Sequence, residues 1–159
     1  MKDGLRVIDS DLHVIEMGDV YENYLEDKYR DKMPKYLGLS PTNFPHWDVQ
    51  GQLIPPWAQS ADVVKAQQFL DAPTEHLYKP VRDKGYDAAS TLKAMDAEGI
   101  DIGVVYRTFA HMVVSIDDLE PAYATAYCAA FNDWLTDYCN TNSKRLKPAA
   151  IVSLHDPEL

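Results

Sequence analysis

The feature that most constrains this chain is the order of helix-type and strand-type segments after residue 85. Residues 88–98 have the pattern of a helix that Asp87 can cap and that Gly99 can end in the left-handed conformation. The segment 101–108 follows, with apolar side chains in nearly continuous order. Such a run is typical of a parallel strand that is covered on both faces.

A second helix is predicted over residues 119–140. Its aromatic side chains recur at three- and four-residue spacing and form one apolar stripe. Two further strands are predicted, a buried one at 5–10 and another at 147–154. The resulting order is strand, long insertion, helix, strand, helix, strand, which predicts an α/β fold with a parallel sheet and right-handed crossovers.

The insertion after the first strand, residues 17–85, holds seven of the ten prolines of the chain. That density argues against long regular elements, so we expect an irregular segment. Within it, residues 20–29 resemble a short helix, a hairpin is predicted to turn near Gln50 and Gly51, and residues 61–70 have the pattern of a helical turn. We therefore predict one domain over 1–159, with 17–85 lying over the active-site face.

Composition excludes some classes of partner. The chain has 15 basic and 25 acidic residues, a formal charge of −10, which argues against nucleic acid and anionic membranes as partners. No apolar run approaches the roughly 18 residues of a membrane span. No signal peptide is evident, so we expect a cytoplasmic protein.

The two cysteines, Cys128 and Cys139, both fall in the predicted helix 119–140. Their separation corresponds to about 16 Å along a regular helix axis, which is too far for a disulfide. We expect two reduced thiols.

Polar side chains follow each predicted strand at its carboxyl end, which is where parallel α/β folds bind ligands. Asp11 and His13 are two residues apart, so on a strand they point to the same side. The candidates after the three strands, in order, are Asp9, Asp11, His13 and Glu16; Arg107, Thr108 and His111; and His155, Asp156 and Glu158.

Asp11 and His13 have the chemistry of metal ligands. Imidazole suits zinc and iron, and a carboxylate widens the choice towards manganese. A catalytic zinc usually takes three protein ligands and keeps one position open for water, so this pair is only part of a site. The alternative is that the Asp-x-His spacing arises by chance and that Asp9 and Asp11 cap local turns.

The remaining candidates have ordinary structural explanations. Arg107 alone is typical of an ion-pair partner, and His111 and His155 are typical of surface or loop histidines. His46 and His76 lie in the insertion, where we expect them to be structural or exposed.

Several motifs, in order along the chain, resemble one family. Residues 7–16 (VIDSDLHVIE) resemble the N-terminus of the amidohydrolase-related metalloenzymes, a group with aminocarboxymuconate-semialdehyde decarboxylase and resorcylate-type decarboxylases. Residues 86–101 are similar to the family's first barrel helix and the turn after it. Residues 127–134 and 145–158 are similar to its next helix and its third strand.

The resemblance implies a metal-dependent (β/α)₈ TIM barrel that acts as a hydrolase or decarboxylase on a small carboxylate. The aromatic side chains of the 17–85 insertion suit an aromatic or otherwise planar substrate. Asp11 and His13 stand at the family's first-strand ligand pair, and zinc is the expected ion, with manganese or iron as alternatives. The metal would polarise the substrate or a bound water. From its position after the second strand, we expect Arg107 to neutralise a substrate carboxylate bidentately.

A (β/α)₈ barrel needs about 250 residues, so we expect a partial barrel with about the first three strands. The family's further ligands, a His after the fifth strand and an Asp after the eighth, would lie beyond residue 159. One interpretation is a piece of a larger enzyme. Another is an enzyme completed by a homo-oligomer or a complementing chain. A third is a non-catalytic interaction module, since unpaired strand edges favour association.

Overall fold

The computed structural model describes residues 4–16, 20–39, 45–55, 84 and 86–158. Its centre is a parallel sheet of three strands in the order β1-β5-β6, formed by β1 (Ile8–His13), β5 (Ile102–Tyr106) and β6 (Leu146–Pro148). The predicted α/β class with a parallel sheet is confirmed, with β5 in the middle. The described residues form no closed barrel.

The helix before β5 begins and ends as the sequence predicts. In α4 (Ala88–Glu98), the Asp87 side chain accepts a hydrogen bond from the backbone N–H of Ser90 at 2.7 Å. Gly99 ends the helix with φ 74°, in the left-handed region that glycine adopts without strain.

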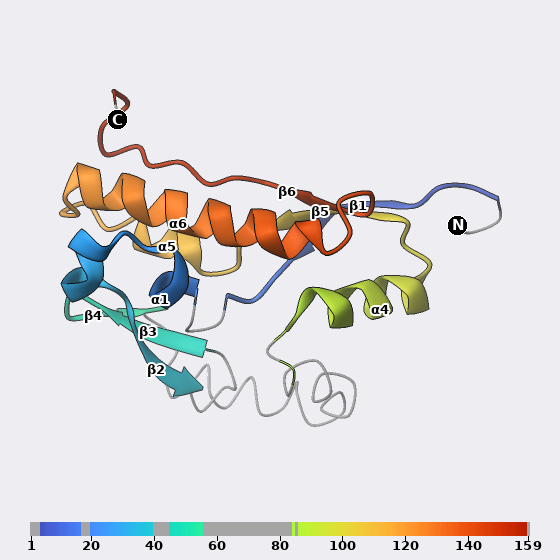
Figure 1. Cartoon of the computed structure of the whole chain (residues 1–159), viewed down its shortest axis with the longest axis horizontal. Coiled ribbons are helices and arrows are strands. Elements are labelled where there is room, and N and C mark those ends of the chain that lie inside the picture. The colour runs from blue at the N-terminus through green and yellow to red at the C-terminus, as the bar shows by residue number, and fades with distance from the viewer. Residues whose placement is uncertain (1–3, 17–19, 40–44, 56–83, 85, 159) are drawn as a thin grey trace.

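The long helix α6 (Pro121–Asn140) starts with proline in its first turn, where the missing N–H costs nothing. Figure 1 shows α6 running along the parallel sheet, with α4 and the small antiparallel sheet on the other side of the helix in this view. The aromatic stripe of α6 is core packing, as predicted. Tyr123, Tyr127, Phe131 and Leu135 are all buried, and Tyr21 stacks on Tyr127 with ring centroids 4.4 Å apart.

The described part of the insertion is more regular than predicted. The expected helix 20–29 is a short helix α1 (Val20–Tyr24) followed by a 3₁₀ helix η1 (Asp27–Lys32). An antiparallel sheet follows, formed by the strands β2 (Lys35–Leu39), β3 (Pro45–Val49) and β4 (Gln52–Ile54).

The β3–β4 hairpin turns at Gln50 and Gly51, as predicted, and both have positive φ, 53° and 84°. Two such residues in succession match the twist of a tight hairpin. The predicted helical turn at 61–70 and His76 lie outside the described residues.

The prediction of a buried first strand at 5–10 is wrong in position and in burial. β1 begins at Ile8, and the side chains of Leu5 and Ile8 are 71% and 58% exposed. The reason is that β1 is an edge strand, whereas the prediction assumed neighbours on both sides. β1 also carries one extra residue between Asp9 and Leu12, which shifts its register against β5.

The predicted third strand, 147–154, is shorter than expected because a helix side chain takes over its pairing. Asn132 of α6 donates from Nδ2 to the Ile151 carbonyl at 2.9 Å and accepts the Ile151 N–H at its Oδ1, also at 2.9 Å. One side-chain amide thus satisfies both backbone groups of Ile151. Beyond it, Val152 and Leu154 are exposed.

Both cysteines lie in α6 as free, buried thiols. Burial raises the pKa of the Cys128 thiol to about 11 and that of Cys139 to about 11. Both side chains therefore pack as small apolar groups. No described helix is long and apolar enough to span a membrane.

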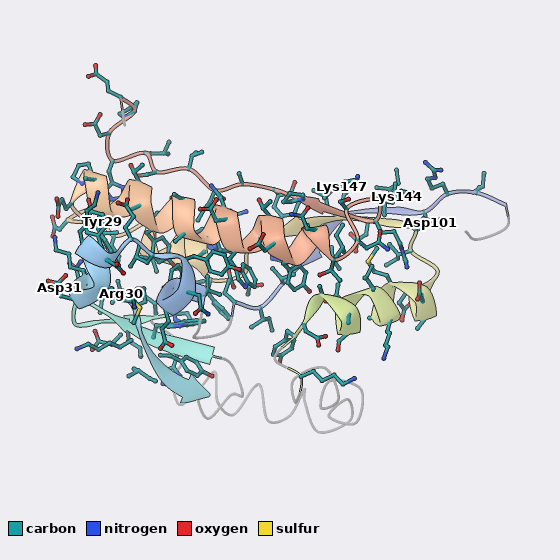
Figure 2. The ribbon with its side chains drawn as sticks, in the orientation of Figure 1. Tyr29, Arg30, Asp31, Asp101, Lys144 and Lys147 are labelled. Atoms are coloured by element: carbon teal, nitrogen blue, oxygen red, sulfur yellow. The ribbon has the colours of Figure 1, made fainter. Side chains whose placement is uncertain are left out.

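Arg145 ties the amino end of the sheet to α4. Its guanidinium donates to the Asp96 carboxylate at 2.6 Å, to the Ile100 carbonyl at 2.7 Å and to the Asp101 carbonyl at 3.1 Å. The Asp101 carboxylate accepts the Val7 N–H at 2.8 Å. Figure 2 places Asp101 with Lys144 and Lys147, far along the molecule from Tyr29, Arg30 and Asp31.

We expect Arg145→Lys to lower the free energy of unfolding by about 1–3 kcal/mol, because an ammonium cannot reproduce the three-way guanidinium contact. Urea denaturation measures this loss. The matched control is Arg30→Lys, whose ion pair with Asp27 is exposed on both sides and whose loss we expect to be below about 1 kcal/mol. Equal losses in the two variants would contradict the role of Arg145.

Candidate active site at the carboxyl end of β1 and β5

Asp11 and His13 lie side by side at the carboxyl end of β1. The Asp11 Oδ1 atom is 3.3 Å from His13 Nε2, and the side chains are 79% and 50% exposed. The two-residue spacing therefore places both groups on the same side, as predicted. Their exposure leaves them accessible to a ligand.

His13 is oriented by a backbone carbonyl just after the neighbouring strand β5. Its Nδ1 lies 2.7 Å from the Arg107 carbonyl oxygen, and because that oxygen only accepts, Nδ1 carries the proton. In the neutral imidazole, Nε2 then presents a lone pair towards the Asp11 carboxylate. Two acceptors this close need a proton or a metal ion between them. An imidazole that donates its other N–H to a carbonyl is the usual arrangement of a metal-binding histidine.

Asp9 does not join this pair in the described contacts. Its carboxylate accepts the Asp11 backbone N–H at 2.9 Å, at the position where β1 carries its extra residue. Within the described ranges, no three metal-ligating side chains lie close enough to hold one ion. Asp11 and His13 therefore amount to two of the three protein ligands of a typical catalytic zinc.

The predicted candidates after the third strand lie outside this pair. His155 hydrogen-bonds the Ile116 carbonyl through Nε2 at 2.9 Å and Ser153 Oγ through Nδ1 at 3.0 Å. Asp156 accepts the Glu158 N–H at 3.0 Å. His46 is buried and bonded to the Gly38 carbonyl, which confirms its structural role.

Arg107 follows β5 and has an unusual environment for an arginine. Its Nε atom is buried without a hydrogen-bond partner, and no ion pair joins its guanidinium to a carboxylate of the described residues. The ordinary explanation for this residue, an ion pair within the chain, thus finds no support in the described part of the structure. Its role as a substrate-binding residue stays a prediction.

His111 lies near Arg107, on the short helix α5 (Ala110–Val113). Its Nδ1 is buried without a partner. Burial, followed by the positive charge of Arg107 and then that of His13, lowers the pKa of His111 below its usual range. The sequence suggested only a loop histidine here, because four helical residues give no periodic signal.

Glu16 fixes the position of the segment that carries Arg107 and His111. Its carboxylate is 1% exposed and accepts the backbone N–H groups of Thr108, Phe109 and Ala110 at 2.9, 3.1 and 3.0 Å. The Thr108 hydroxyl adds a bond to the Val14 carbonyl at 2.6 Å. Glu16 was a candidate for the site. The structure instead makes it a positioning residue that joins the end of β1 to the start of α5.

The surroundings of Glu16 are neutral and tightly packed. The Tyr21 hydroxyl donates to the Tyr127 hydroxyl, and burial raises the pKa of both well above 10. Burial also raises the pKa of Glu16, although hydrogen bonds from four backbone N–H groups, its own included, oppose this.

A cavity of about 540 Å³ lies elsewhere, between β4 and the segment that joins α5 to α6. It is lined by Gln52, Ile54, Met112, Ser115, Ile116, Asp117 and Asp118. None of Asp11, His13 or Arg107 lines it, so this cavity is separate from the candidate site.

We expect Glu16→Gln to change how stability depends on pH. Because burial raises the pKa of folded Glu16 above 4.5, the folded state keeps its proton at a pH where the unfolded chain loses it. The stability that protonated Glu16 contributes is therefore fully present below pH 4.5, and it is lost as pH rises through the pKa of folded Glu16. The free energy of unfolding of the wild type should therefore fall relative to Glu16→Gln over this range.

Urea denaturation from about pH 4 to pH 8 measures the difference. Glu98→Gln, which removes an exposed carboxylate, is the matched control for the change in net charge. Parallel pH curves for the wild type and Glu16→Gln would contradict the prediction.

The sequence and the fold were compared with those of known proteins. No family model and no curated protein matches the sequence. Among solved structures, an amidohydrolase from Mycobacterium avium subsp. paratuberculosis K-10 matches 98% of this chain with a TM-score of 0.59 and 19% sequence identity. The chain spans 44% of that protein's length. The chain therefore has the fold of part of an amidohydrolase.

Proposed function

We propose that this chain carries two of the metal ligands of a metal-dependent hydrolase or decarboxylase, and that Asp11 and His13 bind the ion. The observation that supports the proposal is the geometry of His13. Its Nδ1 is held by the Arg107 carbonyl at 2.7 Å, and its Nε2 lies 3.3 Å from the Asp11 carboxylate. The fold match to part of an amidohydrolase supports the same reaction class.

Asp11 and His13 supply two of the protein ligands that a divalent ion needs. One imidazole and one carboxylate suit zinc best, with manganese or iron as alternatives, and the remaining ligands would come from residues outside the described set. When bound, such an ion supplies Lewis-acid chemistry to a substrate oxygen or to water.

This chain's own residues would then orient the substrate. Arg107 directly follows β5, the strand that pairs with β1, and would bind a carboxylate group of a small substrate bidentately. Trp47 of β3 packs on Phe109 with ring centroids 5.5 Å apart, and both rings are buried in the core, so this pair stabilises the segment after Arg107 rather than facing a substrate.

Titration of the 159-residue chain with Mn²⁺, followed by electron paramagnetic resonance of the free ion, tests the ligand pair. We expect weak binding by the wild type and at least about tenfold weaker binding by Asp11→Asn and by His13→Ala, since each removes a ligand. Asp9→Asn is the matched control because its amide oxygen can still accept the Asp11 N–H. Equal binding by wild type and His13→Ala would refute the ligand role.

A second candidate function is supported by the open edges of the parallel sheet. β1 and β6 are both edge strands, and exposed apolar side chains lie on or beside them: Leu5, Ile8, Val152 and Leu154. We propose that further strands, from a second copy or from a complementing chain, pair with these edges. In that case the chain acts as an interaction module whether or not it binds metal.

Sedimentation velocity of the purified chain tests this second function. We expect concentration-dependent association, because exposed apolar edges template strand pairing, and we expect Ile8→Lys to reduce it. Ala97→Lys is the matched control, since it adds the same charge at an exposed position of the helix α4 rather than on a strand. A monomer at every concentration would contradict the edge-pairing function.

A further inference from the structure

We propose that Arg107 and His111 together form a subsite for a carboxylate group beside the Asp11–His13 pair. Nothing in the fold match assigns such a subsite to these two positions. Its use for a substrate carboxylate rests on the proposed function, whereas binding of the anion can be measured independently of any metal.

The first observation is the unpaired guanidinium. Arg107 Nε is buried without a partner, although acidic residues outnumber basic ones by 25 to 15 in this chain. The exposed arginine Arg30, in contrast, pairs with Asp27 at 2.6 Å. A cation that finds no carboxylate among the described residues is available to an external anion.

The second observation is the unpaired imidazole. His111 Nδ1 is also buried without a partner, and the charges of Arg107 and His13 both act on this ring. Burial, and after it these two charges, lowers the pKa of His111 below its usual range, so the ring is neutral at pH 7 and retains one N–H donor. A bound anion would accept a hydrogen bond from that donor and neutralise the charge of Arg107.

The third observation is that one fixed segment carries both groups. The Glu16 carboxylate binds the N–H groups of Thr108, Phe109 and Ala110, the residues between Arg107 and His111. These backbone donors are therefore already used by Glu16. An external anion would be held by the two side chains, and their positions are set before it arrives.

The charge beside the subsite favours a carboxylate over a phosphate. A guanidinium can bind either anion through two parallel bonds, and the His111 N–H supplies a third donor. Asp11 lies 3.3 Å from His13 Nε2, on the same edge of the sheet, and its negative charge disfavours a dianion there.

Nuclear magnetic resonance of the chain labelled in its histidine rings tests the subsite at constant pH, with benzoate as the probe and without metal. We expect benzoate to shift the His111 ring signals in a saturable manner. The His155 ring, held by Ile116 and Ser153, serves as the internal reference and should not move. We expect at least about tenfold weaker benzoate binding in Arg107→Gln, because the bidentate contact is lost.

Arg30→Gln is the matched control for loss of one positive charge and should bind benzoate as the wild type does. His111→Asn provides a second variant, in which benzoate shifts of the labelled Arg107 side chain should weaken. Unmoved His111 signals, or equal affinity in Arg107→Gln and the wild type, would overturn the subsite. Inorganic phosphate binding as tightly as benzoate would overturn its preference for carboxylates.

The outcome separates this subsite from the proposed metal pair. Arg107→Gln should still bind Mn²⁺, because the Arg107 backbone carbonyl that orients His13 is retained. Benzoate binding without Mn²⁺ binding would support the anion subsite and contradict the proposed metal function. Mn²⁺ binding without benzoate binding would support the metal pair and contradict the anion subsite.

Discussion

A single buried carboxylate connects the parts of the molecule that matter for chemistry. Glu16 follows β1 in the sequence, yet its oxygens bind three successive N–H groups that lie more than 90 residues further along the chain. The hydrogen bond from His13 to the Arg107 carbonyl spans the same two segments. Without Glu16, α5 would lose the partner of its first N–H groups, and His111 would lose its fixed position beside Arg107.

Local sequence signals predicted the parts of the fold that local interactions determine. α4 was predictable because its cap, Asp87, and its stop, Gly99, are both adjacent to it, and α6 because its apolar stripe repeats regularly. The exposure of β1 was not predictable, since burial depends on which strands lie beside it. The short third strand was missed because the group that replaces its partner, Asn132, belongs to a helix.

The same distinction holds for the candidate site. Alternation along a strand was enough to place Asp11 beside His13, since their two-residue spacing survives the extra residue in β1. That Arg107 and His111 lack partners is a property of the tertiary structure, and the sequence offered only their types and order. Glu16 was recognised as a polar residue after the first strand, but its role depends on α5, which is too short to be predicted.

The Asn132–Ile151 contact also bears on how an additional strand would join the sheet. Because a helix side chain holds Ile151, the path of the chain beyond β6 is directed by α6 and does not depend on a neighbouring strand. The segment after β6 is therefore held in place in advance, although the backbone groups of Ile151 are already bonded to Asn132. An incoming strand would lose less conformational entropy by docking beside such a pre-organised segment than beside a frayed one.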